Sequence, residues 1–110
     1  IYTLSLHDAL PISIWECKSL QKLNNIPFEK GISNIIKLKQ IIYIKESGTL
    51  NLIFEYMYQD LYELMKKKKK LSEDEIRKIS YETLLGLSLM HKYGFFHRDL
   101  KPENLLVSQN

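Results

Sequence analysis

The sequence predicts an α+β protein that combines a short antiparallel sheet with amphipathic helices. Residues 38–44 and 50–54 are rich in β-branched and aromatic residues and are separated by a short polar segment, which is typical of a strand pair joined by a turn. Residues 14–24 and 76–90 instead carry apolar residues at three- and four-residue spacing, the pattern of a helix with one buried face. With 45% hydrophobic and 26% charged residues, the composition is ordinary for a globular chain.

The first thirteen residues differ from the rest of the chain. They follow no sustained hydrophobic period and resemble translated cloning or sequencing-adapter sequence. A signal peptide is the alternative, but the segment lacks the basic start and the uninterrupted apolar centre that such peptides need. We therefore expect residues 1–13 to be artefactual or disordered and to take no part in the fold.

The helix expected over residues 14–24 places Cys17 and Leu20 on its apolar face. It also carries Glu16, which by its position alone is an exposed helix carboxylate. Cys17 is the only cysteine, so no internal disulfide can form and a reducing compartment is expected. Residues 25–33 contain proline and glycine and are predicted to form a loop, where extra length costs little stability.

The second predicted strand ends at Phe54 and is followed by Glu55 and Met57. Backbone donors and acceptors just past a strand end are free to bind a ligand, even without special side chains. Asp60 then precedes a short predicted helix over residues 61–67. Its carboxylate is expected to cap that helix by accepting backbone N–H bonds.

Five consecutive lysines, Lys66 to Lys70, are the most conspicuous source of the formal net charge of +3. We interpret them as a solvated helix end with a loop, the alternative being a nucleic-acid tether or a nuclear address. The run lacks interleaved aromatic residues and any known nucleic-acid-binding motif, so a nucleic-acid partner is not expected. No apolar run is long enough to cross a bilayer, so no membrane partner is expected either.

A long helix is predicted to begin after Ser72. Ser72 and Glu75 form a capping box, and the acidic residues at 73–74 add negative charge to the positive first turn. Apolar residues then continue at helical spacing to Met90, and Gly94 supplies a stop. A rigid helix of this kind is expected to hold the polar segment that follows in a fixed place.

That polar segment, residues 97–104, reads His-Arg-Asp-Leu-Lys-Pro-Glu-Asn. Asp99 is followed by a lysine at 101 and an asparagine at 104. These residue types suit phosphoryl transfer, because a carboxylate can orient a hydroxyl, a cation can meet the transferred phosphate and an amide oxygen can hold Mg²⁺. The alternative is a polar loop between a helix and a strand, with no chemistry of its own.

These segments together resemble a eukaryotic serine/threonine protein kinase. Residues 97–104 match the catalytic-loop pattern H-R-D-L-x-x-x-N, and Lys101 is typical of the serine/threonine class. The sequences of residues 54–57, 60–65 and 91–96 are most similar to those of the male-germ-cell-associated and intestinal-cell kinase group, relatives of the cyclin-dependent and mitogen-activated kinases.

The resemblance implies an incomplete two-lobed protein-kinase fold. Residues 14–57 would form the end of the N-lobe, with helix C, strands four and five and the hinge. Residues 58–110 would form the start of the helical C-lobe, with helices D and E and the catalytic loop. The sequence contains no glycine-rich phosphate loop, no strand lysine and no Asp-Phe-Gly metal ligand, so we expect the chain alone to be inactive.

The resemblance also implies roles for residues of the catalytic loop, with ATP and Mg²⁺ as cofactors. Asp99 would act on the hydroxyl of a substrate Ser or Thr, Lys101 would neutralise charge on the γ-phosphoryl group, and Asn104 would ligate Mg²⁺. Arg98 would pair with a phosphorylated activation-loop residue. His97 would serve packing and hydrogen bonding rather than proton transfer.

The family's nucleotide site maps onto five further residues. Phe54 would screen the back of the adenine pocket, and the Glu55 carbonyl and the Met57 amide would bind the edge of adenine. Leu106 would form the floor under adenine. Asp60 would lie near the ribose, and both readings stay open: a helix cap alone, or a cap that also contacts ribose.

The implied function is ATP-dependent phosphoryl transfer to Ser or Thr residues of protein substrates. In this reading Glu16 would pair with the strand lysine and regulate activity; the exposed helix carboxylate remains the alternative. A non-catalytic kinase-like fragment or pseudokinase, acting by protein association, is the alternative function. The expected location is cytoplasmic, with the nucleus and the cilium as alternatives.

Overall fold

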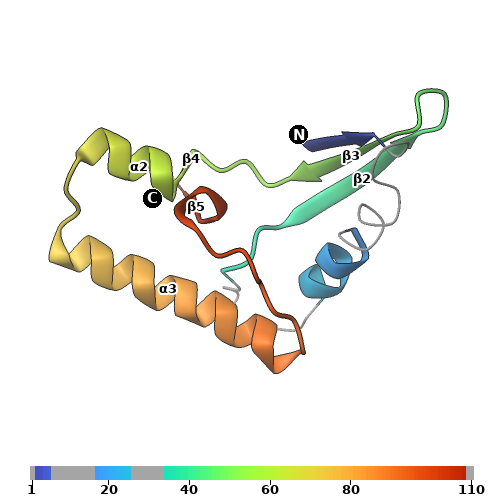
Figure 1. The fold of residues 1–110 in the computed structure, drawn as a ribbon. Helices are drawn as coiled ribbons and strands as arrows, with labels where there is room; N and C mark the ends of the chain where they lie inside the picture. Colours follow the sequence, from blue (N-terminus) through green and yellow to red (C-terminus); the bar gives the residue numbers. More distant parts are fainter. Residues whose placement is uncertain (1, 6–16, 26–33, 109–110) are drawn as a thin grey trace. The chain divides into compact units, whose positions relative to one another are not determined.

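The computed structural model describes residues 2–5, 17–25 and 34–108 (Figure 1). It divides into two compact units: of the described residues, the first holds 2–5, 17–25 and 35–55, and the second holds Asn34 and 56–108, so the main division falls between Glu55 and Tyr56. The sequence-based division lay two residues later, between 57 and 58. Both helices and antiparallel strands are present, so the α+β class is confirmed.

The first unit contains a three-stranded antiparallel sheet of order β1-β3-β2. In this sheet Ile41 lies opposite Leu52, and Ile44 lies opposite Thr49. The predicted strand pair is therefore confirmed. Gly48 in the connecting turn has a φ of 65°, a conformation that residues with a Cβ adopt only with strain. The strands are β1 (Tyr2–Ser5), β2 (Leu38–Ile44) and β3 (Thr49–Phe54).

The expectation that residues 1–13 take no part in the fold is wrong for residues 2–5. Tyr2 lies opposite Leu52 and Ser5 opposite Thr49, so β1 covers the edge of β3 that β2 leaves open. The physical reason is that an open strand edge presents unpaired N–H and C=O groups that an extended segment can satisfy, whatever its hydrophobic period. Residues 6–13 lie outside the described residues.

The buried core of the first unit comes from the helix at residues 17–24 and from β3, and Leu38 and Ile41 of β2 pack against it. Cys17, Leu50 and Leu52 are buried together, and Leu52 is only 1% exposed. Residues 17–24 are helical, and Leu20 packs against this core, as the apolar spacing predicted. The burial of Cys17 fits a packing role for its thiol.

The second unit contains two helices and a two-stranded antiparallel ladder, in which β4 pairs with β5. Asp60 caps α2 as predicted, because its Oδ1 accepts a hydrogen bond from the Glu63 N–H at 2.8 Å. Three of the five consecutive lysines form the last turn of α2, which supports the interpretation of a solvated helix end. The elements are β4 (Gln59–Asp60), α2 (Leu61–Lys68), α3 (Glu73–Lys92), the 3-10 helix η2 (Pro102–Asn104) and β5 (Leu106–Val107).

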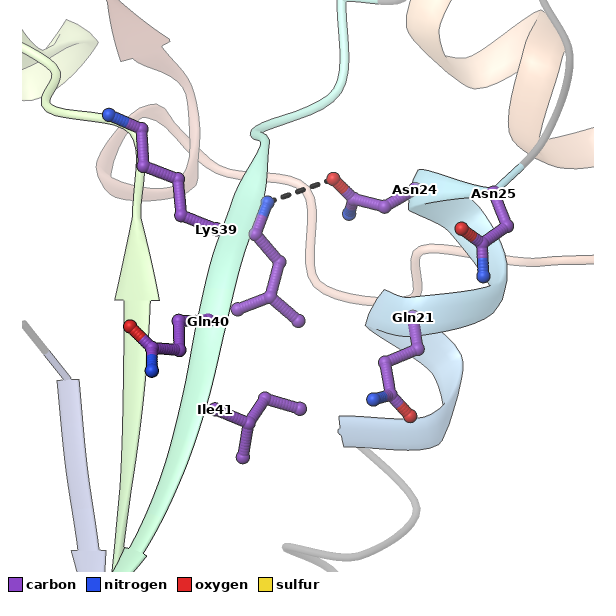
Figure 2. A pocket seen from close by; sticks show the side chains of 7 residues that line it. Gln21, Asn24, Asn25, Lys39, Gln40 and Ile41 are labelled. Carbon is purple, nitrogen blue, oxygen red and sulfur yellow. Dashed lines mark hydrogen bonds between the residues drawn. The ribbon is translucent and has the colours of Figure 1, made fainter.

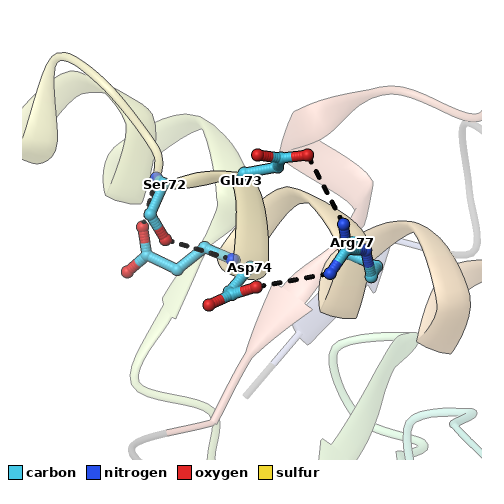
Figure 3. Close-up of polar contacts among 5 residues, drawn as sticks. Ser72, Glu73, Asp74 and Arg77 are labelled. Atoms are coloured by element: carbon cyan, nitrogen blue, oxygen red, sulfur yellow. Dashed lines mark hydrogen bonds and ion pairs between the residues drawn. The ribbon is translucent and has the colours of Figure 1, made fainter.

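The start of α3 confirms the predicted capping box. Ser72 Oγ accepts from the Glu75 N–H at 3.2 Å, and Glu75 Oε2 accepts from the Ser72 N–H at 2.8 Å. Glu75 also pairs with Lys68. The bond to Lys68, and after it the bond to the Ser72 backbone, lower the pKa of the Glu75 carboxyl below its ordinary value. The Arg77 guanidinium lies 3.4 Å from the carboxylates of both Glu73 and Asp74 (Figure 3). These ion pairs are exposed to solvent and contribute little to stability.

α3 carries an unusually close approach at one point. Gly86 is buried, and a Cβ at this position would lie 3.0 Å from the Asn34 carbonyl oxygen, so only glycine fits without a shift. The helix ends as predicted, with Gly94 at a φ of 84°. None of the described helices combines the length and apolar character that a membrane crossing requires.

Candidate active site

The end of α3 leads directly into the predicted catalytic loop. The Phe95 N–H donates to the Met90 carbonyl at 2.9 Å, and the rings of His91 and Phe96 lie 5.4 Å apart. These contacts tie the first residues after the helix back to its last turns. The loop therefore begins from a position that the helix sets, which is what the sequence predicted for α3.

The three predicted catalytic residues are brought together in the second unit. Asn104 Nδ2 donates to the Asp99 backbone carbonyl at 2.8 Å and to Asp99 Oδ2 at 3.2 Å. Lys101 Nζ lies 3.5 Å from the same carboxylate oxygen. The turn of η2, in which the Asn104 N–H donates to the Lys101 carbonyl at 2.9 Å, folds the chain back so that these side chains converge.

This arrangement leaves particular atoms for chemistry. Because Asn104 commits its Nδ2 to Asp99, its Oδ1 is the amide atom left to act as a ligand. Amide and carboxylate oxygens suit Mg²⁺, which binds through one or two protein groups together with substrate phosphates and water. Among the described residues, no group of three or more His, Cys, Asp or Glu side chains is arranged so that it could hold a metal ion. The Asp99 carboxylate and Asn104 Oδ1 are oxygen donors of the kind that Mg²⁺ binds.

His97 has a contact that the sequence reading did not specify. Its Nδ1 accepts a hydrogen bond from the Asp99 backbone N–H at 3.2 Å. The ring nitrogen is therefore used to orient the backbone that carries Asp99, which supports a hydrogen-bonding role over proton transfer. Arg98, between them, has a φ of 69° and an exposed side chain. Its pairing with a phosphorylated residue stays a prediction.

Two of the predicted nucleotide-binding residues lie side by side in the second unit. Asp60 is opposite Leu106 in the β4–β5 ladder, and the Leu61 N–H donates to the Leu105 carbonyl at 2.7 Å. Leu106 is 47% exposed, so its side chain is available for contact. The cap formed by Asp60 is confirmed, and its ribose contact stays a prediction. Met57 also belongs to this unit.

Phe54 and Glu55 belong to the first unit. Phe54 ends β3 opposite Leu38, and the Glu55 N–H donates to the Lys37 carbonyl at 2.8 Å. The Glu55 N–H is thus committed within the unit, which is compatible with the expectation that its carbonyl meets adenine. Glu16, the predicted regulatory carboxylate, lies outside the described residues.

The sequence reading missed Asn24, which holds the end of the helix at residues 17–24 against the chain that enters β2. No local spacing signals this role, because its partners Ile36 and Leu38 lie 12 and 14 residues further along the chain. An asparagine at a helix end is common as a cap, so its residue type alone indicates no further role. Only the hydrogen bonds identify it as a link between two elements.

Comparison with known proteins finds one matching family and several relatives. Residues 11–110 match the family described as "Protein kinase domain". The chain is 51% identical over 96 residues to "Serine/threonine-protein kinase ICK" of Rattus norvegicus and, equally, to "Serine/threonine-protein kinase MAK" of Homo sapiens; each match covers 86% of this chain and 14% of the relative. It is 45% identical over 100 residues to "Cyclin-dependent kinase F-4" of Oryza sativa subsp. japonica, covering 90% of this chain and 20% of that protein.

The chain therefore spans a small part of the length of the curated relatives that it matches. The resemblance read from the catalytic loop is confirmed, and so is the similarity to the male-germ-cell-associated and intestinal-cell kinase group. The α+β architecture and the converging Asp99, Lys101 and Asn104 accord with an incomplete kinase domain. The chain belongs to the protein kinase family.

Proposed function

We propose that the longer protein containing this chain transfers the γ-phosphoryl group of ATP to Ser or Thr residues of protein substrates, with Mg²⁺ as cofactor. The observation that carries the proposal is the convergence of Asp99, Lys101 and Asn104, with the Asp99 carboxylate held between a cation and an amide. The relatives named as serine/threonine-protein kinases support the same substrate class.

The functional residues of the catalytic loop divide the work of this reaction among them. Asp99 orients the attacking hydroxyl and accepts its proton, while Lys101 neutralises the charge that develops on the transferred phosphoryl group. Asn104 would hold Mg²⁺ through its Oδ1, and the bound ion would neutralise phosphate charge. The Asn104 amide and His97 hold Asp99 in place through the bonds described above.

The nucleotide is bound mainly by backbone groups. The family resemblance assigns the adenine edge to the Glu55 carbonyl and the Met57 amide, the back of the adenine pocket to Phe54 and its floor to Leu106. Asp60 contacts the ribose while capping α2. Such contacts bind ATP equally in the ground state and the transition state, so they set its affinity rather than the rate of transfer.

The test is phosphoryl transfer by the purified longer protein. Incubation with radiolabelled ATP, Mg²⁺ and a generic basic protein substrate should label Ser and Thr, and acid hydrolysis should release phosphoserine and phosphothreonine. Asp99→Asn is the control that should abolish most of this label. Absence of transfer with intact protein association would establish the alternative, a non-catalytic kinase-like protein. For its location we propose the cytoplasm, with the nucleus or the cilium as alternatives that imaging of the tagged protein would separate.

A further inference from the structure

Asn24 lies at the end of the helix at residues 17–24 and uses both atoms of its amide. Its Nδ2 donates to the Leu20 carbonyl at 2.9 Å, within the helix, and to the Ile36 carbonyl at 3.3 Å. Its Oδ1 accepts from the Leu38 N–H at 2.8 Å (Figure 2). One side chain therefore joins the helix to Leu38, the first residue of β2, and to Ile36 just before the strand.

The amide pairs with β2 as a neighbouring strand would. The Ile36 carbonyl and the Leu38 N–H flank Lys37, and a residue on a parallel neighbouring strand bonds the same two groups. Successive residues of an extended chain present their polar groups to opposite sides. The Lys37 carbonyl accordingly faces the other way and accepts from the Glu55 N–H at 2.8 Å.

These bonds form a short chain from Asn24 to Glu55. Asn24 holds the peptide groups on either side of Lys37, and Lys37 holds the backbone of Glu55. All five residues of this chain, including Ile36 and Leu38, belong to the first unit. The Lys37 side chain is exposed, so the link runs through its backbone alone.

We propose that Asn24 is a positioning residue for nucleotide binding: through the backbone of residues 36–38 it fixes Glu55, whose carbonyl accepts a hydrogen bond from the adenine amino group. This inference rests on the proposed function, since it assigns a task to a residue that touches no substrate. Asn24 acts before any chemical step, so it governs affinity for the adenine part of ATP.

The surroundings of Asn24 indicate what its loss would do. It lines a hollow of about 540 Å³ together with other polar side chains, among them Gln21 and Gln40 (Figure 2). The hollow is open, so water can replace the lost bonds to Ile36 and Leu38. A substitution here should therefore loosen the 36–38 segment without leaving polar groups buried and unsatisfied, and the sheet should stay folded.

Two substitutions separate the two atoms of the amide. Asn24→Ala removes the donor and the acceptor together. Asn24→Asp keeps an oxygen for the Leu38 N–H but turns a second oxygen toward the carbonyls of Leu20 and Ile36, where a donor is required. Asn25→Ala is the matched control, because Asn25 lines the same hollow and Figure 2 draws no hydrogen bond from its side chain to the strand.

The experiment measures backbone hydrogen exchange and nucleotide affinity in the longer protein. In Asn24→Ala, exchange of the Leu38 and Glu55 amides should quicken by about 5- to 20-fold, the factor for one ordinary hydrogen bond or somewhat more. Exchange of the Leu52 amide in the core should not change. The KM for ATP and the Kd for adenosine should rise by the same factor, with kcat unchanged. Asn24→Asp should keep the Leu38 amide protected and show a smaller rise.

The Kd for adenosine distinguishes an effect on the adenine contacts from a general effect on ATP binding, because adenosine lacks the phosphates. A rise in KM for ATP without a change in the Kd for adenosine would overturn the proposal. Faster exchange of the Leu52 amide by the same factor would also overturn the proposal. So would a KM for ATP in Asn24→Ala that lies within twofold of the KM in Asn25→Ala. If Asn24→Ala does not fold, Asn24→Asp decides by the same comparisons.

The proposed function and this inference fail in different ways. A parent protein that binds adenosine but transfers no phosphate contradicts the proposed function, while the adenosine measurements still test Asn24. A parent protein that transfers phosphate normally in the Asn24 variants contradicts only the positioning of Glu55. A parent protein that binds neither ATP nor adenosine contradicts both.

Discussion

Asn104 has two tasks in the proposed reaction, and its substitutions separate them. Its Nδ2 donates to the Asp99 carbonyl at 2.8 Å and to Asp99 Oδ2 at 3.2 Å, which leaves its Oδ1 for Mg²⁺. Asn104→Ala removes both tasks. Asn104→Asp keeps an oxygen ligand but loses the N–H donor and sets a second carboxylate beside Asp99. Asp99→Asn removes the base and leaves the metal ligand in place.

The two bonds from Asn104 join exposed groups, so each contributes at the ordinary level of about 1 kcal/mol. Loss of both should cost about 2 kcal/mol of positioning, or about 30-fold in kcat for Asn104→Asp. Asp99→Asn should cost about 10²- to 10⁴-fold in kcat, because a positioned base is lost. The KM for ATP should stay near the parental value in Asp99→Asn, since the hinge backbone and the metal bind the nucleotide.

Steady-state kinetics of the three variants across a Mg²⁺ titration check this division. Raised Mg²⁺ should recover part of the loss in Asn104→Ala and none of the loss in Asp99→Asn or Asn104→Asp. Near-parental kcat in Asp99→Asn, or its recovery by Mg²⁺ to the same extent as Asn104→Ala, would refute Asp99 as the base. Parental kcat in Asn104→Asp would refute the positioning task of the Asn104 amide.

Four further predictions concern other parts of the chain. The 110-residue chain alone should transfer no phosphate from ATP and should self-associate in size-exclusion chromatography, because it has no glycine-rich loop and Tyr81 and Leu84 are each 63% exposed; transfer to a basic substrate, or cooperative melting of a monomer, would contradict this. Ser72→Ala should lower the stability of α3 by about 1 kcal/mol in denaturant titrations monitored by circular dichroism. Because the pKa of Glu75 is lowered in the folded state, its contribution should be present above the ordinary carboxyl value of about 4.3 and be lost as pH falls through the lower folded value; a Glu75→Gln variant with the same acid profile would count against it. Deletion of residues 1–13 should speed amide exchange along the edge of β3, and unchanged exchange there would show that β1 does not hold that edge in solution.

Much of this protein's structure was readable from local sequence signals. The capping box of Ser72 and Glu75, the cap at Asp60 and the stop at Gly94 each act within a few residues, so spacing alone predicts them. The richness of residues 38–44 and 50–54 in β-branched and aromatic side chains located β2 and β3, and the pattern of residues 97–104 located the catalytic loop. These signals are strong because propensity, capping and backbone geometry depend on near neighbours.

Other features were decided only by tertiary structure. β1 pairs with β3 through backbone groups that every residue carries, so the hydrophobic period of its side chains did not predict the strand. Asn24 bonds partners 12 and 14 residues away, and Asn104 turns its amide onto Asp99 because η2 reverses the chain. By itself, the sequence determined which segments are helix, strand and catalytic loop. Which groups meet depends on where the chain returns in space, and that is set by packing and backbone pairing over long separations.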